Sequence, residues 1–203
     1  MIKKTMTKRV LLVIALLLFT VPNVAAKEIR MPTFSFNQPK GWKTTLRERH
    51  RIQIAKLLHH RSTSVILFDS NKSPESEGKT LKEMLPYTLG LVKRTNKRFR
   101  DYLLSNNTSI PNLPLLRDVV EVGTSLAKIG HFECILSSLL LMPMDTKAVP
   151  IAFLSMTSIG NGRRYNITVT IQSNDIKVVH ELLGESFKII ETYKTFQNGI
   201  TPI

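Results

Sequence analysis

Residues 149–171, VPIAFLSMTSIGNGRRYNITVTI, contain the pattern that decides the fold. Gly160-Asn161-Gly162 lies near their middle, and glycine and asparagine accept the positive φ angles that a tight hairpin turn requires. After this turn, apolar residues occupy every second position from Tyr165 to Ile171 and polar residues fill the positions between. Alternation with period two is typical of a strand with one buried face. The segment therefore predicts an antiparallel hairpin with strands at residues 149–158 and 164–171.

Shorter apolar runs on the N-terminal side predict the rest of the sheet. We expect further strands at residues 34–36, 52–58, 64–68, 118–126 and 127–141, with Gly130 at the entry of the last. Residues 69–79 are polar and include Pro74 and Gly78, so they predict a loop.

Two helices are predicted, one between the strands and one after them. The first begins at Thr80, which with Glu83 fits a capping box, and ends at Asn106-Asn107; Pro86 should bend it or end a first short piece. Its apolar stripe is Leu81, Leu85, Leu89, Val92, Phe99 and Leu103.

The second helix is capped by Ser173 or Asn174. Its stripe is Ile176, Val179, Leu183, Phe187 and Ile190. This order predicts an α+β fold, an antiparallel β-sheet flanked by helices.

Residues 1–26 predict a cleavable secretory signal peptide. A basic start is followed by an apolar run at 10–21, a break at Pro22, and the small residues Val24-Ala25-Ala26. The alternative is a membrane anchor, but this run is well short of the ~20 residues that a spanning helix needs. We expect a signal peptide at 1–26, a single α+β domain at 27–193 and a loose C-terminal tail at 194–203. The protein would then be periplasmic or secreted, without a transmembrane span in the mature chain.

The composition limits the function further. The 203 residues carry 29 Lys and Arg against 15 Asp and Glu, and removal of residues 1–26 would leave a net charge of +10. One domain of this size buries a sufficient core, which matters because the single Cys134 can form no internal disulfide. A basic balance favours acidic partners, or serves solubility alone.

The segment Phe34-Ser35-Phe36-x-x-Pro39-x-Gly41-Trp42 is similar to the opening strand and P-x-G-W turn of the PsbP/DcrB-like superfamily. The ending resembles it too, with a strand at 165–171 leading into a helix that closes on residues 186–189, and Gly130 to Cys134 matches its middle loosely. The resemblance covers most of residues 34–190. It implies a PsbP-like α/β/α sandwich in an exported protein that supports or binds other proteins and has no shared catalytic motif. The basic segment 40–61 departs from it, which leaves the family's partners in doubt.

Two groups of side chains in the sequence could carry chemistry. Adjacent residues on a strand point to opposite faces, so His59-His60 cannot chelate a metal there and we expect a solvated loop. The same alternation separates Cys134 from His131 and Glu133, so we expect a buried structural thiol and not a Cys–His nucleophile. The sequence predicts no metal, no cofactor and no enzyme.

One surface feature suggests binding. Five basic residues fall on the helix face opposite the apolar stripe: Lys93, Arg94, Lys97, Arg98 and Arg100. A second basic set comprises Lys40, Lys43, Arg47, Arg49 and Arg51.

We interpret the chain as an exported accessory protein of the bacterial envelope that binds another protein. The alternative is an anion-binding exported protein that contacts envelope polymer, anionic lipid or nucleic acid. An ordinary solvated helix face is the simplest interpretation of the same residues.

Overall fold

The structure is a computed structural model that describes residues 26–58, 62–106, 108 and 113–196. The predicted signal peptide lies outside these residues except for Ala26, and so does His59-His60. The elements, in chain order, are β1 (Lys27–Arg30), β2 (Phe34–Gln38), β3 (Lys43–Arg47), β4 (Arg51–Leu57), β5 (Thr63–Lys72), the short 3-10 helix η2 (Pro74–Ser76), α2 (Leu85–Ser105), β6 (Leu116–Ile129), β7 (Phe132–Pro143), β8 (Ile151–Gly160), β9 (Arg163–Gln172), α3 (Ile176–Glu191) and β10 (Lys194–Thr195).

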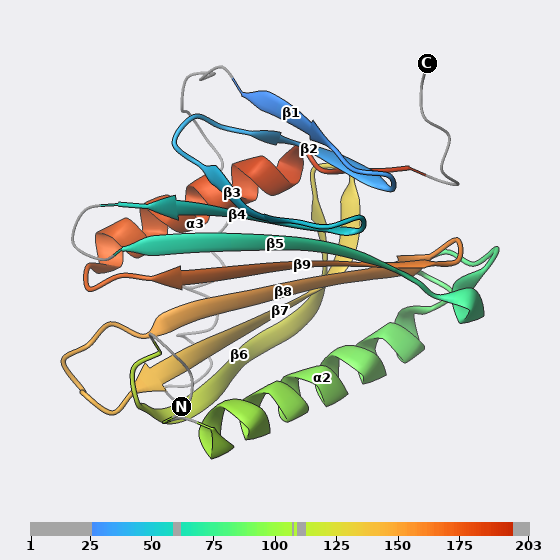
Figure 1. Cartoon of the computed structure of the whole chain (residues 1–203). Coiled ribbons are helices and arrows are strands. Elements are labelled where there is room, and N and C mark those ends of the chain that lie inside the picture. The colour runs from blue at the N-terminus through green and yellow to red at the C-terminus, as the bar shows by residue number, and fades with distance from the viewer. Residues whose placement is uncertain (1–25, 59–61, 107, 109–112, 197–203) are drawn as a thin grey trace.

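The described strands form two antiparallel sheets (Figure 1). The large sheet has the order β3-β4-β5-β9-β8-β7-β6, and the small sheet has the order β1-β2-β10. The predicted hairpin joins β8 to β9 at the middle of the large sheet. Gly160 pairs with Arg163 there, and Asn161 and Gly162 have φ angles of 51° and 74°. The α+β class and the antiparallel sheet with flanking helices are therefore confirmed, with a second sheet that the sequence did not predict.

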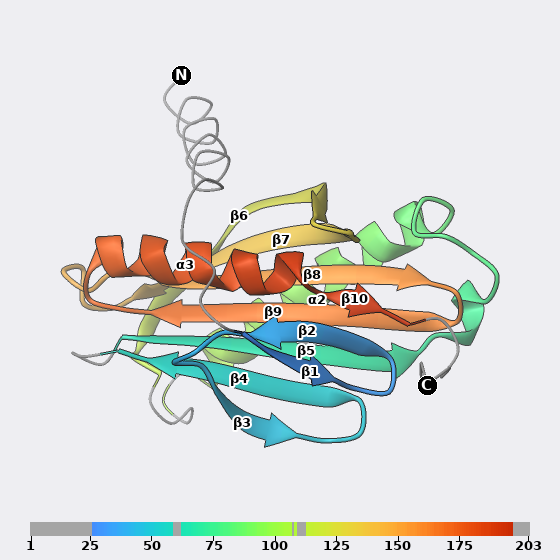
Figure 2. The ribbon, with the colours of Figure 1, turned by 90° about the horizontal axis from the view of Figure 1, so that it is seen from above.

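The main core lies between the large sheet, α3 and the small sheet. The alternation on β9 places Ile167, Val169 and Ile171 in this core, each fully buried, while Asn166 and Thr168 point to the other face and are half-buried. Figure 2 shows α3 on one side of the large sheet and α2 on the other.

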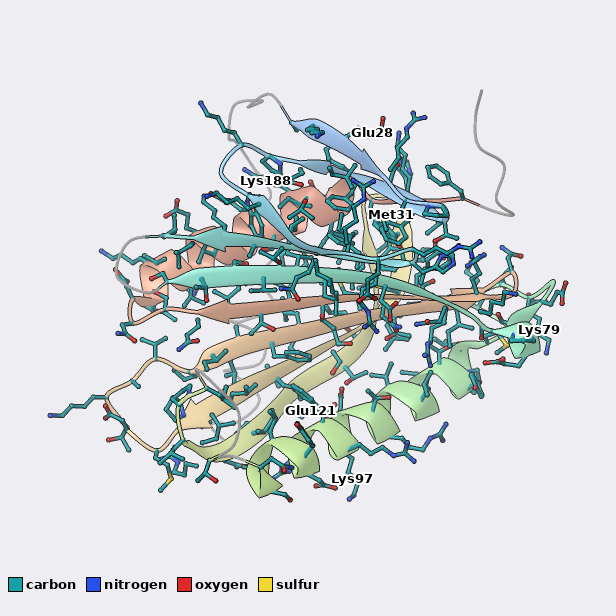
Figure 3. The ribbon with its side chains drawn as sticks, viewed as in Figure 1. Glu28, Met31, Lys79, Lys97, Glu121 and Lys188 are labelled. Carbon is teal, nitrogen blue, oxygen red and sulfur yellow. The ribbon has the colours of Figure 1, made fainter. Side chains whose placement is uncertain are left out.

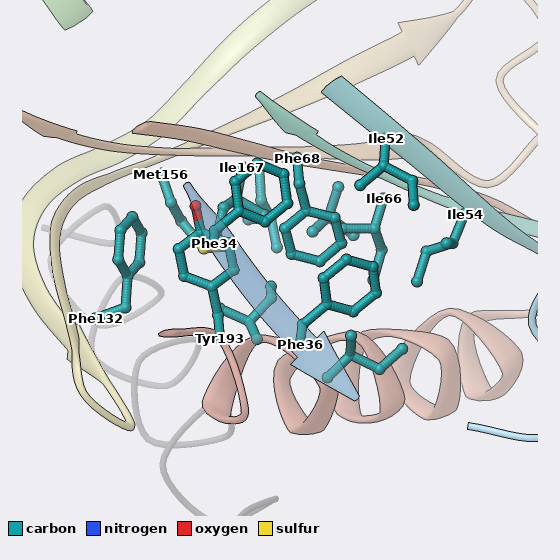
Figure 4. Close-up of a cluster of buried hydrophobic side chains, with 14 of the residues drawn as sticks. Phe34, Phe36, Ile52, Ile54, Ile66, Phe68, Phe132, Met156, Ile167 and Tyr193 are labelled. Carbon is teal, nitrogen blue, oxygen red and sulfur yellow. The ribbon is translucent and has the colours of Figure 1, made fainter. Parts of the chain in front are cut away.

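Aromatic rings connect the two sheets inside the main core. Phe36 of β2 stacks on Phe68 of β5 with ring centroids 4.1 Å apart. Tyr193, which follows α3, lies 5.5 Å from Phe68 and 5.4 Å from Phe34. These four rings come from β2, from β5 and from the end of α3, so they join the three layers of the core (Figure 4). We call them the aromatic cluster.

The P-x-G-W turn and the docking of the last helix form as the resemblance implies. Gly41 has a φ of 91°, and Trp42 is buried with its Nε1 donating to Glu185 Oε2 of α3 at 3.2 Å. Lys56 of β4 binds the same carboxylate, with 2.6 Å between Nζ and Oε1. Ser186 is fully buried, and its Oγ lies 3.1 Å from Ser64 Oγ. The turn therefore fastens the edge of the large sheet to α3.

Several predicted strands need correction. β1 and β3 were not predicted, because both are short and mostly exposed and so carry no apolar alternation. The predicted loop at 69–79 begins too early, since β5 continues through Lys72 along β9. The expectation of a loose tail is wrong for its first residues, because Lys194 and Thr195 pair with β2 as β10; residues 197–203 lie outside the described residues.

Residues 127–141 do not form the single strand that the sequence predicts. They comprise the end of β6 and most of β7. β6 runs to Ile129, Gly130 and His131 make the turn, and β7 begins at Phe132. Gly130 has a φ of 59°, a left-handed conformation that glycine adopts readily and most other residues adopt only at a cost in energy. An apolar run that crosses a hairpin looks continuous in the sequence, so the pattern predicts a strand entry at Gly130, where the structure has a turn.

The predicted cap and stripe of α3 also differ from the structure. Asp175 caps the helix, with its Oδ1 accepting from Lys177 N at 2.8 Å, and neither Ser173 nor Asn174 does. Ile176 is 53% exposed, whereas Leu182 and Ser186 are fully buried. The helix contacts both sheets, so its buried arc is wider than a single apolar stripe and includes the small Ser186.

Two glycine substitutions test the hairpin of β6 and β7. Both Gly130 and Gly162 have positive φ angles, but a Cβ at 130 would overlap the Glu191 carbonyl, while a Cβ at 162 meets no atom within 4 Å. We expect Gly162→Ala to lower the free energy of unfolding by about 1–2 kcal/mol through backbone strain alone. Gly130→Ala should cost about 3 kcal/mol, because steric overlap adds to that strain. Urea unfolding measures both, and equal losses would contradict the contact between this turn and α3.

Candidate functional site

Helix α2 begins five residues later than predicted. The capping box does form, with Thr80 N donating to Glu83 Oε2 at 2.7 Å and Glu83 N donating to Thr80 Oγ1 at 3.4 Å. It closes a turn ahead of the helix, and the α-helix itself starts at Leu85 with Pro86 in its first turn, where proline is tolerated. Pro86 was expected to bend the helix or to end a first short piece, and it instead lies in the first turn of α2. The predicted end at Asn106-Asn107 is confirmed by Asn106 at the C-cap.

The inner side of α2 is more polar than the predicted stripe. Its buried residues are Thr88, Val92, Asn96 and Leu103. Leu103 packs with β6, β7 and β8 in a second, smaller core made of Leu103, Leu116, Val119, Leu139, Leu141 and Ile151. Asn96 reaches the sheet as well, where its Nδ2 donates to the buried Ser137 Oγ at 2.6 Å. The helix is thus anchored by apolar contacts at its C-terminal half and by a polar contact in its middle.

All five basic residues predicted on α2 are exposed. Lys97 points away from the large sheet (Figure 3) and pairs with Asp101 at 2.7 Å. Arg100 pairs with Asp118 of β6 at 3.0 Å. Lys93, Arg94 and Arg98 make no hydrogen bond or ion pair with any described residue. The face is therefore cationic, with three side chains available to a partner.

The second basic set lies elsewhere on the molecule. Its members lie in the turn after β2, along β3, and in the segment that leads into the start of β4. This is the edge of the large sheet opposite β6. Arg51 is already engaged, 3.8 Å from Asp69 and 4.0 Å from Glu48. Since α2 packs on β6, β7 and β8, the fold does not bring the two basic sets together.

Cys134 is the buried structural thiol that the alternation predicted. It is fully buried in the main core, and burial raises the pKa of its thiol to about 12. Glu133 points to the other face, where its Oε1 lies 3.9 Å from Lys128 Nζ, and His131 lies in the turn. A thiol with this pKa stays protonated at neutral pH and cannot act as a nucleophile.

A polar cavity between α2 and the large sheet was not predicted. Its volume is about 150 Å³, and its walls come from α2, β8 and β9: Leu91, Val92, Thr95, Asn96, Ser155, Thr157, Arg164 and Asn166. The sequence alone predicts that every second residue of β9 is polar and points away from the main core. Only the fold, however, brings α2 beside them.

Within the described ranges, neither helix is long and apolar enough to cross a membrane. The described His, Cys, Asp and Glu side chains also form no group of three that could hold a metal ion.

No protein-family model matches the sequence, and no curated protein matches it either. Solved structures do match the fold. Cyanobacterial PsbP (CyanoP) from Synechocystis is 11% identical, with 88% of this chain and 96% of that chain covered and a TM-score of 0.54. A crystal structure from Bacteroides thetaiotaomicron is 13% identical over 86% of this chain, with a TM-score of 0.49, and this chain spans 50% of its length. LpqN of Mycobacterium tuberculosis, involved in cell envelope biogenesis, is 14% identical, with 86% of this chain and 92% of that chain covered and a TM-score of 0.45. At these identities the likeness shows the fold alone, so the predicted PsbP-like architecture is confirmed.

The raised pKa of Cys134 predicts a pH-dependent stability. The folded state holds the thiol proton more tightly than the unfolded chain, whose thiol has an ordinary pKa of 9.0. This contribution is fully present below pH 9 and is lost as the pH rises toward 12. The stability difference between wild type and Cys134→Ala should therefore fall by about 1.4 kcal/mol per pH unit above pH 9. Chemical denaturation from pH 8 to pH 11 measures it, and a constant difference would show that the thiol is not buried.

Proposed function

We propose that this protein is an exported, non-enzymatic accessory protein that binds an acidic surface of another protein through the outer face of α2. One observation carries the proposal: Lys93, Arg94 and Arg98 are exposed and have no acidic partner among the described residues. Surface charges usually gain little from internal pairs, so three unpaired cations within about two helical turns are free to contribute to association.

Two exposed tyrosines extend this face. Tyr87 is 44% exposed and Tyr102 is 57% exposed. At about 100° per residue, Tyr87, Arg94, Arg98 and Tyr102 fall within an arc of roughly 80°. They form a line about 22 Å long, since the helix rises 1.5 Å per residue. We call these four residues the Tyr–Arg line.

The composition of the Tyr–Arg line favours a protein partner over a polymer or lipid. Tyrosine and arginine are enriched at protein interfaces and among the residues that contribute most to binding energy. A surface that only tracks an anionic polymer or membrane requires positive charge and gains little from two tyrosines spaced along a helix. Export of the protein is supported by the pattern of residues 1–26.

The experiment compares two charge reversals of equal size. Arg94→Glu with Arg98→Glu changes the Tyr–Arg line, and Lys43→Glu with Arg47→Glu changes the exposed basic set at the opposite edge of the sheet. Proteins of the envelope fraction are crosslinked to each variant and identified, and the affinity of the recovered partner is then measured with purified components. We expect the α2 variant to bind at least about tenfold more weakly and the control to bind like wild type.

Substitution of the two tyrosines distinguishes a protein partner from an anionic polymer or lipid. Tyr87→Ala with Tyr102→Ala should also weaken a protein partner, because the aromatic contact area is lost. Retention on heparin or on anionic vesicles should be insensitive to these two substitutions. Binding that depends on charge and salt alone, or that is lost equally in both charge reversals, would contradict the proposal and favour the anion-binding alternative.

A further inference from the structure

Arg164 is the only charged residue that lines the cavity beneath α2. Its Nε is buried without a hydrogen-bond partner, and its guanidinium makes no hydrogen bond or ion pair with any described residue. Buried polar groups in proteins nearly always have a partner, so an unpartnered nitrogen on a cation requires an explanation. A guanidinium also offers several donors in a planar fork that matches an oxyanion.

Two carboxylates in this part of the molecule, those of Asp69 and Glu75, are engaged with other groups. Asp69 of β5, which lies directly across from Asn166, accepts from Asn71 Nδ2 at 2.8 Å and pairs with Arg51 at 3.8 Å. Glu75 accepts from Ser73 Oγ at 2.7 Å and from Tyr87 OH at 3.2 Å. The pKa of Glu75 is lowered mainly by its hydrogen bond from Ser73, with a smaller contribution from the charge of Arg164. Arg164 therefore attracts this carboxylate without forming an ion pair among the described residues.

The remaining polar walls supply donors. Asn166 accepts from Thr157 Oγ1 through its Oδ1 at 3.2 Å, which leaves its Nδ2 free to donate. The hydroxyls of Thr95 and Ser155 also line the cavity, and no carboxylate does. One cation surrounded by amide and hydroxyl donors is the arrangement that binds a negatively charged oxygen.

The cavity has the size of a small ligand. Its volume of about 150 Å³ is that of an engineered protein cavity that admits benzene, although that one is apolar and dry. It therefore accommodates a carboxylate or a phosphate group and not a sugar chain or an extended peptide.

We propose that this cavity is a binding site for one oxyanion group, a carboxylate or a phosphate of a small molecule, with Arg164 as its bidentate ligand and Asn166 as a second donor. The site is distinct from the Tyr–Arg line, because none of the four residues of that line contributes to the cavity walls. It does not depend on the proposed protein partner.

Nuclear magnetic resonance of the arginine Nε–Hε groups tests the proposal directly. The ¹⁵N-labelled protein is titrated with sodium phosphate and, separately, with sodium acetate, while sodium chloride keeps the ionic strength constant. We expect one Nε–Hε resonance, identified as Arg164 by its absence in Arg164→Lys, to shift and saturate with at least one of the two anions. The anion with the lower midpoint identifies the class of ligand.

Three variants provide the controls. Arg164→Lys keeps the charge but loses the planar fork, and should weaken binding at least about tenfold. Asn166→Asp keeps the acceptor for Thr157 and places a negative charge in the cavity, so it should abolish binding even if Arg164→Lys does not fold. Arg117→Gln, at an exposed position of β6 that does not line the cavity, should bind like wild type.

Thermal unfolding gives a second measurement, because a ligand that binds only the folded state raises the melting temperature. The increase should occur in wild type and Arg117→Gln and disappear in Asn166→Asp. The proposal is overturned if the Arg164 resonance does not shift, if all arginine resonances shift together without saturation, or if Asn166→Asp responds to the anions like wild type.

Discussion

The packing of the small sheet on the large sheet through the aromatic cluster is the interaction on which the rest of the structure depends. Phe36 and Phe68 stack at 4.1 Å, and Tyr193 fixes the end of α3 against both sheets. Phe34, Phe36, Phe68 and Tyr193 are each at most 1% exposed. An aromatic pair contributes about 0.5–1.5 kcal/mol beyond its buried area, so the cluster holds β2, β5 and α3 together as one core. Because β10 follows Tyr193 directly, the same ring also positions the last strand beside β2.

This packing closes only one face of the large sheet. On the other face, α2 packs mainly on β6, β7 and β8 and meets β9 at the cavity, and α2 makes no comparable contact with β5 or β4. The side chains there are partly polar and half-buried, as Asn166, Thr168 and Asp69 show. The polar cavity lies where the covered part of this face meets the uncovered part. The asymmetry between the two faces therefore accounts for the position of both proposed surfaces, the outer side of α2 and the cavity on its inner flank.

The sequence predicted the elements whose pattern is set locally. The alternation of β9, the Asn161-Gly162 turn and the exposed basic side of α2 depend on nearest neighbours and on helical periodicity. The failures come from contacts between distant segments. β1 and β3 are stabilised by the strands beside them, Ser186 is buried because α3 faces Ser64, and Gly130 turns the chain against Glu191. The cavity could not be predicted, because Asn96 and Arg164 are 68 positions apart and only the fold brings them together.

The difference between the two faces of the large sheet is tested most directly by thiol labelling. In a Cys134→Ala background, which leaves no native thiol, Thr168→Cys places a thiol on the partly open face and Ile167→Cys places one in the main core. A core thiol reacts only when the strand opens, so Thr168→Cys should react at least about a hundredfold faster in the native protein. Equal labelling rates for the two positions would contradict the assignment of a closed and an open face.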